Sequence, residues 1–346
     1  MIHIDADHEL IRYTGRIGFE DPKQPLFTWV CSSLRFMLKG NKCVLKIDNK
    51  RLYWKSILGL IVNGAEMRLD LQDGMQEIDI SRHLIDDVND VLVYKRQDSC
   101  HNFSFAGMEI EGELMPLPER PARRMEVYGD SVSAGEVCEA MHCVGQSDPQ
   151  GHDGIFSNSW YCYGWQTARA LGAELHDIAQ GGIALHDKRG WFNAPDYIGM
   201  QSCWDKVNYN PNLGPVTDWE FAKYVPHVVV VALGQNDANP DNYMKNDPEG
   251  DKAREWKRDY TDFIRGLRAK YPKATILLAM TVLGHDKEWD DAIEDVCNGL
   301  QDARVHHFLY HRNGRATPGH PRMSEHTEMA RELTAYIRGL GDAIWE

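Results

Sequence analysis

The chain has 346 residues, of which 42% are hydrophobic, and a formal net charge of −14. This length exceeds the size at which one core usually stops growing, so two domains are expected. The negative charge argues against nucleic acid or an anionic membrane as partner, and no apolar run approaches the length of a membrane span. A neutral substrate fits better.

The first residues, Met1–His8, have neither the basic start nor the apolar core of a secretory signal, so a cytoplasmic protein is expected. The eight cysteines lack the paired spacing of metal ligands, which favours free thiols. Cys138, Cys143, His142 and His152 lie near one another in the sequence. They form no Cys-x-x-Cys or helical His pair, and we expect no zinc there.

Residues 1–118 are predicted to form an all-β domain. Short apolar or alternating runs, separated by turn residues, indicate strands at 33–38, 43–47, 53–58 and 91–95. Regularly spaced short strands are typical of a β-sandwich or jelly roll. A proline-rich stretch at 114–121 is predicted to link this domain to a second one, residues 119–346.

The second domain alternates apolar strands with helical patterns. The strands include 125–129, 228–232 and 275–279, and the helices include 160–171, 252–270 and 324–338. This alternation predicts an α/β fold, with a parallel sheet flanked by helices. Ser324, followed by Glu325, is the expected N-cap of the last helix.

The strand at 125–129 runs into Gly129-Asp130-Ser131, which nominates Ser131 as a nucleophile. A serine hydroxyl needs a general base and hydrogen-bond donors for the oxyanion that forms on attack. The predicted base is His320, in a Pro/Gly-rich loop just before the last helix. Asp130 is assigned to the turn itself.

Two further segments follow apolar strands and are expected to supply oxyanion donors. Gly181-Gly182 permits close backbone approach to a ligand, and the Asn236 amide can donate to negative charge. With the Ser131 N–H, this makes three donors. Ligand sites of open α/β sheets collect at such strand ends.

The order Ser, Gly, Asn, His resembles the SGNH, or GDSL-type, hydrolase superfamily over about residues 121–346. The resemblance implies that Ser131 is the nucleophile, that Ser131, Gly182 and Asn236 form the oxyanion hole, and that His320 is the base. Gly181 is the alternative to Gly182. Most of the superfamily has an Asp where this chain has Thr317. A backbone carbonyl or a more distant carboxylate then orients His320, or a Ser-His dyad operates.

The chain is similar to carbohydrate esterase family 2, whose members remove O-acetyl groups from plant polysaccharides. The similarity lies in a β-sandwich that precedes an SGNH domain, and in the segments Thr14–Arg16 and 27–36. The resemblance implies a serine acetylesterase that acts on xylan- or mannan-derived oligosaccharides without a metal or organic cofactor. Trp160, Trp191 and Trp289 are candidates for stacking on the sugar, although packing is the favoured role of Trp160. The first domain could contribute contacts with the sugar, but its simplest role is structural, covering one side of the catalytic domain.

Two other functions stay open. An SGNH lipase or thioesterase acting on other short acyl esters is one, but the chain has no long apolar lid segment. A non-catalytic carbohydrate-binding protein is the other. Thr317 suggests it, whereas intact Ser131, Asn236 and His320 argue against it. The sequence specifies neither the sugar, nor the acetylated hydroxyl, nor the oligomeric state.

Overall fold

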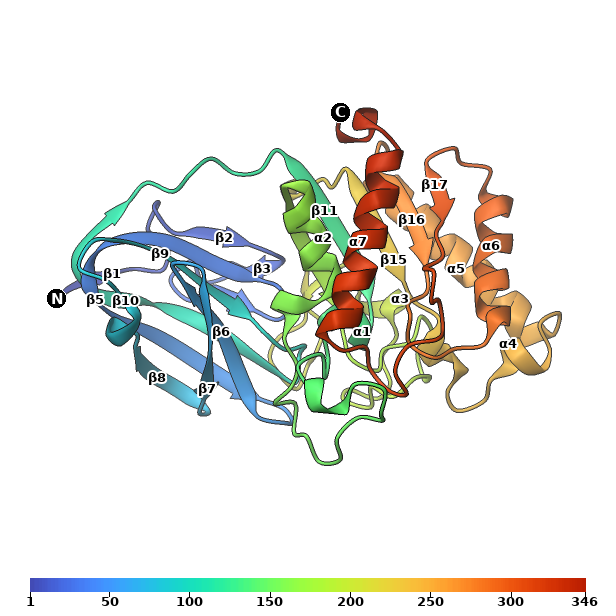
Figure 1. The fold of residues 1–346 in the computed structure, drawn as a ribbon, viewed down its shortest axis with the longest axis horizontal. Coiled ribbons are helices and arrows are strands. Elements are labelled where there is room, and N and C mark those ends of the chain that lie inside the picture. Colours follow the sequence, from blue (N-terminus) through green and yellow to red (C-terminus); the bar gives the residue numbers. More distant parts are fainter.

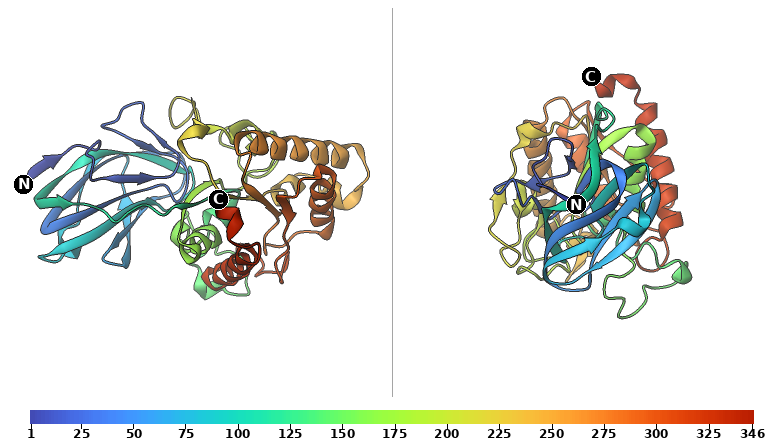
Figure 2. Two further views of the ribbon diagram at one scale, coloured as in Figure 1. Left: turned by 90° about the horizontal axis from the view of Figure 1, so that it is seen from above. Right: turned by 90° about the vertical axis from the view of Figure 1, so that its left-hand side faces the viewer.

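Two sheets organise the chain in the computed structural model, which describes residues 1–346 (Figure 1). An antiparallel sheet forms the N-terminal domain, and a parallel sheet with flanking helices forms the C-terminal domain. The domains lie side by side, with the N-terminus at the end remote from the parallel sheet (Figure 2). The segment 116–122, which joins them, has no regular secondary structure.

The N-terminal sheet has ten strands in the order β3-β4-β10-β5-β9-β6-β7, with β1 on β10 and β2 and β8 on β5. Alternate residues of β5, such as Phe36, Leu38, Leu45 and Ile47, are buried in one core. The predicted all-β first domain is therefore confirmed. Its strands are β1 (Ile2–Ile4), β2 (Arg12–Thr14), β3 (Ile17–Gly18), β4 (Leu26–Phe27), β5 (Ser33–Arg51), β6 (Ser56–Val62), β7 (Ala65–Leu71), β8 (Gly74–Asp79), β9 (Val88–Lys95) and β10 (His101–Met115).

The ends of three predicted strands in this domain differ from the structure. The strands expected at 33–38 and 43–47 are one strand, β5, because the chain bulges at Gly40 instead of turning, beside a register shift in β10. The strand expected at 53–58 begins only at Ser56 and continues through Gly59. Gly59 lies inside this strand. A glycine is needed there because the Tyr94 ring packs where a Cβ would lie.

The C-terminal sheet has the strand order β12-β11-β15-β16-β17, and all pairs are parallel. Every residue of β15 and β16 is buried, as their unbroken apolar sequences predict for a sheet covered on both faces. The predicted α/β fold is thus confirmed. The strands are β11 (Arg123–Gly129), β12 (Ala173–Ala179), β15 (Val228–Ala232), β16 (Thr275–Ala279) and β17 (Val305–His307); β13 (Lys206–Asn208) and β14 (Thr217–Asp218) form a separate pair.

Helices cover both faces of this sheet. α2 and α7 share one core with it, and α5 and α6 share the other (Figure 1). No helix combines the length and the apolar character that crossing a membrane requires. The α-helices are α1 (Ser131–Ala134), α2 (Tyr163–Leu171), α3 (Met200–Cys203), α4 (Tyr243–Asn246), α5 (Asp251–Lys270), α6 (Lys287–Leu300) and α7 (Met323–Gly339), and short 3-10 helices occur at Ser81–His83, Met141–Cys143, Ser159–Tyr161, Phe221–Lys223, Gln235–Ala238 and Asp342–Trp345.

The start of α7 differs from the prediction. The N-cap is Arg322, whose backbone N–H donates to Glu325 Oε2 at 2.9 Å. Ser324 therefore lies within the first turn and caps nothing. The bond from the Arg322 N–H to the Glu325 carboxylate satisfies a donor at the start of α7 and fixes the end of the loop that carries His320.

A buried ion pair joins the two domains. Arg16 follows β2 and extends into the core of the second domain, where its Nη2 lies 2.9 Å from Glu126 Oε1. Both side chains are fully buried, and the Tyr128 hydroxyl also donates to Glu126, at 2.9 Å. The first domain therefore supplies the countercharge for a carboxylate inside the parallel sheet.

We expect Arg16→Met to lower the free energy of unfolding by about 3–5 kcal/mol, because it leaves the Glu126 carboxylate buried without a cation. Urea unfolding followed by tryptophan fluorescence measures the loss. Adding Glu126→Leu to this variant is expected to recover part of it. A single variant as stable as the wild type would contradict the assigned pairing.

Candidate active site

Ser131 lies at the junction of β11 and α1. Asp130 caps the helix, since Val132 N–H donates to its Oδ1 at 3.0 Å. The side-chain amides of Gln235 and Asn236 donate to its Oδ2 at 2.6 and 3.1 Å. Burial raises the pKa of Asp130 to about 6, although these donors oppose the shift. With both oxygens engaged, Asp130 holds the turn, as predicted.

Ser131 itself is nearly buried, with 4% of its surface exposed. It is the first residue of α1, where a backbone N–H has no acceptor within the helix. This N–H is therefore suited to stabilise negative charge at the helix N-terminus. The strand-to-helix turn thus presents both a hydroxyl and a donor at one point.

The imidazole of His320 is held by a carboxylate that the sequence did not reveal. His320 Nδ1 lies 2.7 Å from Asp148 Oδ2, and the backbone N–H of His320 donates to Asp148 Oδ1 at 3.1 Å. Arg322 Nη1 also donates to Oδ1, at 2.8 Å. Asp148 is 172 residues from His320 in the chain. Of the alternatives opened by Thr317, the structure therefore contains the more distant carboxylate.

Thr317 has a different role. Its hydroxyl accepts a hydrogen bond from the backbone of Gly145, and its N–H donates to Glu325 Oε1 at 3.0 Å. These bonds connect the loop of His320 both to the segment that precedes Asp148 and to the start of α7. Thr317 thus helps to position the two loops that bring Asp148 to His320.

The charges shift both pKa values of this pair. Burial alone would raise the pKa of Asp148, but hydrogen bonds with His320 and Arg322 outweigh it and lower the pKa to about 2. Burial lowers the pKa of His320, yet the hydrogen bond with Asp148 and the charge of Glu136 raise it overall. Asp148 is therefore ionised at neutral pH and stabilises an imidazolium.

The structure distinguishes the two glycines by whether their backbone N–H groups are free. Gly181 N–H donates to Asp98 Oδ2 at 3.0 Å and is thus occupied. The Gly182 N–H has no acceptor, and its carbonyl accepts from Trp191 N–H at 2.8 Å. Gly182 has a φ of 75°, and a Cβ there would lie 2.9 Å from the Phe192 nitrogen. A side chain is thus excluded, and the Gly182 N–H stays free for a ligand.

Asn236 lies in the 3-10 helix that follows β15 and is half-buried. One of its two amide hydrogens is directed to Asp130. The second hydrogen is available for another acceptor. The amide is thereby fixed against the same Asp130 that caps the nucleophile turn.

A cavity of about 260 Å³ lies beside these residues and is formed by both domains. Of the two roles left open for the first domain, the structure therefore favours a contribution to the cavity beside a structural one. Tyr53 and Trp54, which the pattern of residues 53–58 predicts as strand, precede β6 and line the cavity. The cavity is lined by Tyr53, Trp54 and Asp98 of the first domain and by Glu136, Gly181, Gly182, Trp191, Phe192 and Asn193 of the second.

Only one of the three predicted tryptophans lies at this cavity. Trp191 lines it and is 69% exposed. Trp289 is fully buried on the inner side of α6, where its Nε1 donates to Asn242, so that prediction was wrong. Trp160 lines a separate cavity between the domains and stacks against Arg169, so its role at the site was wrong and its packing role stands.

Glu136 is a second charged group that sequence reasoning missed. The Glu136 Oε2 atom lies 3.7 Å from His320 Nε2. No hydrogen bond joins His320 Nε2 to Ser131 Oγ in this structure. Burial raises the pKa of Glu136 to about 7, together with the charges of Asp98, Asp148 and Asp130 and against the charge of His320. The imidazole thus lies between two carboxyl groups, one on each ring nitrogen.

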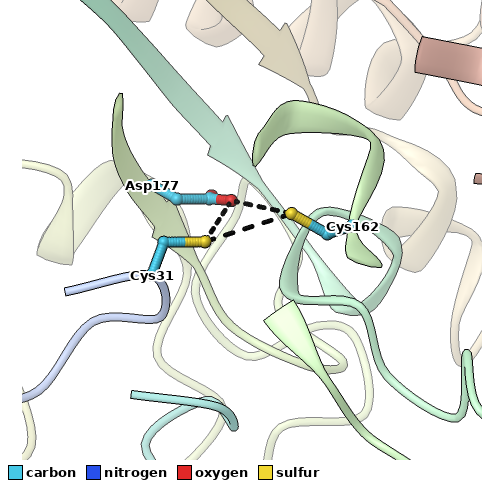
Figure 3. A group of neighbouring side chains, drawn as sticks. All are labelled: Cys31, Cys162 and Asp177. Atoms are coloured by element: carbon cyan, nitrogen blue, oxygen red, sulfur yellow. Dashed lines mark hydrogen bonds between the residues drawn. The ribbon is translucent and has the colours of Figure 1, made fainter. Parts of the chain in front are cut away.

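A group of thiols lies at the contact between the domains (Figure 3). Cys31 Sγ lies 4.0 Å from Cys162 Sγ, and the two thiols lie 3.6 and 3.8 Å from Asp177 Oδ2. Burial raises the pKa of the Asp177 carboxyl group well above its usual range. The three side chains thus bond to one another, and all eight cysteines of the chain are free.

Comparisons with known proteins agree on one family. The family model "Carbohydrate esterase 2 N-terminal" matches residues 13–118. The chain is 27% identical to cellulase/esterase CelE of Acetivibrio thermocellus over 96% of its own length and only 40% of that protein. It is 26% identical to the acetylxylan esterase / glucomannan deacetylase of Cellvibrio japonicus, covering 98% of this chain and 91% of that one.

Solved structures give the same result. The structure of a family two carbohydrate esterase from Clostridium thermocellum, in complex with cellohexaose, superposes with a TM-score of 0.80 at 26% identity. The match covers 97% of this chain and all of the other. The predicted resemblance to carbohydrate esterase family 2 is therefore confirmed across both domains.

Proposed function

We propose that this chain, which resembles carbohydrate esterase family 2 along its whole length, removes acetyl groups from acetylated xylan- or mannan-derived oligosaccharides. The observation that supports this most is the His320–Asp148 pair, whose His320 Nε2 lies 3.7 Å from Glu136, a residue that lines an aromatic cavity. Two relatives named as esterases, one of them a glucomannan deacetylase, also support it. The cytoplasmic location stays a prediction from the sequence.

In the proposed mechanism, Ser131 Oγ attacks the acetyl carbonyl while His320 Nε2 takes its proton. The oxyanion accepts hydrogen bonds from the N–H groups of Ser131 and Gly182 and from the Asn236 amide. The His320 imidazolium, stabilised by Asp148, then protonates the departing sugar oxygen. Water attacks the acetyl-serine with His320 again as base, and acetate leaves. For the first step, His320 Nε2 must move from Glu136 to Ser131.

We expect Asn236→Ala to lower kcat about 10²- to 10³-fold, because one oxyanion donor is lost. Gln235→Ala is the matched control. Gln235 also donates to Asp130 Oδ2, so this variant disturbs the same cap without removing the proposed donor. Steady-state rates on 4-nitrophenyl acetate compare the two. Equal losses in both variants would assign Asn236 to the cap alone.

We expect Glu136→Gln to shift the acidic limb of the kcat/KM profile to lower pH. His320 acts as a base only when neutral, so activity falls as the pH drops through its pKa. The Glu136 charge raises that pKa, and removing the charge lowers it. A profile from pH 4 to 9 with 4-nitrophenyl acetate measures the shift. An unmoved or alkaline-shifted limb would contradict the contact between Glu136 and His320.

Acetate release and mass spectrometry test the function directly. Acetylated xylo- and manno-oligosaccharides are incubated with the wild type and with Ser131→Ala. Loss of single acetyl masses with the wild type alone is the expected result. Cleavage of an aryl acetate without any release from the sugars would favour an esterase or thioesterase of other acyl groups. Inactivity on both, with oligosaccharide still bound, would favour a binding protein.

A further inference from the structure

We propose that Glu136 is a specificity residue whose carboxylate accepts a hydrogen bond from a free sugar hydroxyl next to the acetyl ester. This rests on the proposed function, because it concerns the same cavity and the same substrate class. It would make the enzyme select partly acetylated sugars over fully acetylated ones.

The backbone fixes Glu136 close to the nucleophile. Gly135 ends α1 in the left-handed conformation, with a φ of 72°, and turns the chain. Glu136 N–H then donates to the Ser131 carbonyl at 2.9 Å. The Glu136 carboxylate packs against the backbone of Gly181, where a Cβ would lie 2.5 Å from its Oε2. The side chain is therefore held between the nucleophile turn and the oxyanion loop.

The Glu136 carboxylate has acceptor capacity that the protein does not use. Its side chain is 11% exposed, lines the cavity, and accepts no hydrogen bond from any N–H or O–H of the chain. Asp98, the other carboxylate there, already accepts three hydrogen bonds, from Gly181 N–H, Gln180 Nε2 and Cys100 N–H. Buried acceptors are usually paired. Of the two carboxylates, Glu136 is the one whose acceptor sites the protein leaves wholly unused.

The position selects the kind of donor. His320 Nε2, which protonates the leaving sugar oxygen in the proposed mechanism, lies 3.7 Å from Glu136 Oε2. A substrate group that donates a hydrogen bond to Glu136 must therefore lie close to the ester oxygen. In a sugar, that group is the hydroxyl on the neighbouring carbon. The indoles of Trp54 and Trp191 line the same cavity and offer flat apolar faces to a pyranose ring.

The test compares two substrates with three proteins. The substrates are a xylobiose with one acetyl group beside a free hydroxyl and a fully acetylated xylobiose, and the proteins are the wild type, Glu136→Ala and Glu136→Gln. At pH 8 the ratio of kcat/KM values, mono-acetylated over fully acetylated, is expected to fall about 10- to 100-fold in Glu136→Ala, because a hydrogen bond to a charged group is lost. Glu136→Gln keeps an acceptor oxygen and should retain part of the preference.

The outcomes separate this proposal from the proposed function. An unchanged ratio in Glu136→Ala would overturn the hydroxyl contact while the esterase assignment stands. An equal loss on both substrates, with an unchanged melting temperature, would also overturn it, because Glu136 would then act only through His320. A wild type that hydrolyses neither xylobiose would overturn the carbohydrate esterase function and this proposal with it.

Discussion

Replacing Ser131 with alanine is expected to lower kcat about 10⁶-fold, which would be the largest effect of any single substitution in this chain. The acyl-enzyme route needs an oxygen nucleophile, and Ser131 is the hydroxyl residue that follows β11 and opens α1. A residual rate above that of water is still expected. The oxyanion donors and substrate binding are unaffected by the substitution.

Two controls make this result specific. Ser133→Ala changes a second serine of α1, whose hydroxyl lies 2.8 Å from the Tyr163 hydroxyl in the core, and it should alter stability rather than kcat. His320→Ala and the Ser131→Ala/His320→Ala double variant should be about as slow as Ser131→Ala alone, because the two residues act as one unit. Fully additive losses in the double variant would contradict the shared step.

The catalytic segments were predictable because their positions depend on local sequence. Ser131, Gly182 and Asn236 each follow a buried parallel strand within a few residues, and parallel strands bring their carboxyl ends to one edge. The apolar runs of β11 and β15 identify the strands before Ser131 and Asn236 without tertiary information. The same holds for the parallel sheet as a whole.

The acids of the site were not predictable for the opposite reason. Asp148 reaches His320 from a long loop after α1, and no motif or spacing marks it. Its approach depends on tertiary bonds such as those from Arg322 and between Thr317 and Gly145. Glu136 stands near Ser131 in the sequence, but its proximity to His320 appears only once the two loops have packed.

The predicted roles of three aromatic residues depended on where α6 and β6 begin. Trp289 is a predicted sugar contact, but α6 begins at Lys287 and places the indole on the buried face of the helix. Tyr53 and Trp54 were expected in a strand, which begins only at Ser56, and the two rings instead line the cavity. Through these two rings, the first domain forms part of the cavity wall.

Replacing Asp148 with asparagine is expected to lower kcat about 10⁴-fold with a much smaller change in KM. An asparagine amide cannot hold the Nδ1 proton of His320 as a carboxylate does, and it no longer stabilises the imidazolium. The Asp148 charge also raises the pKa of His320, so its removal lowers that pKa. The acidic limb of the kcat/KM profile should therefore move to lower pH even as the rate falls.

The matched control for this substitution is Asp153→Asn, because Asp153 lies in the same segment but is exposed. It should leave kcat near the wild-type value. Since Arg322 is buried and also bonded to Asp148, the melting temperature of Asp148→Asn must be measured, and rates compared well below it. If the folded variant kept kcat within about tenfold of the wild type, the orienting carboxylate would be dispensable. Ser131 and His320 would then work as a dyad, which is the alternative that Thr317 left open.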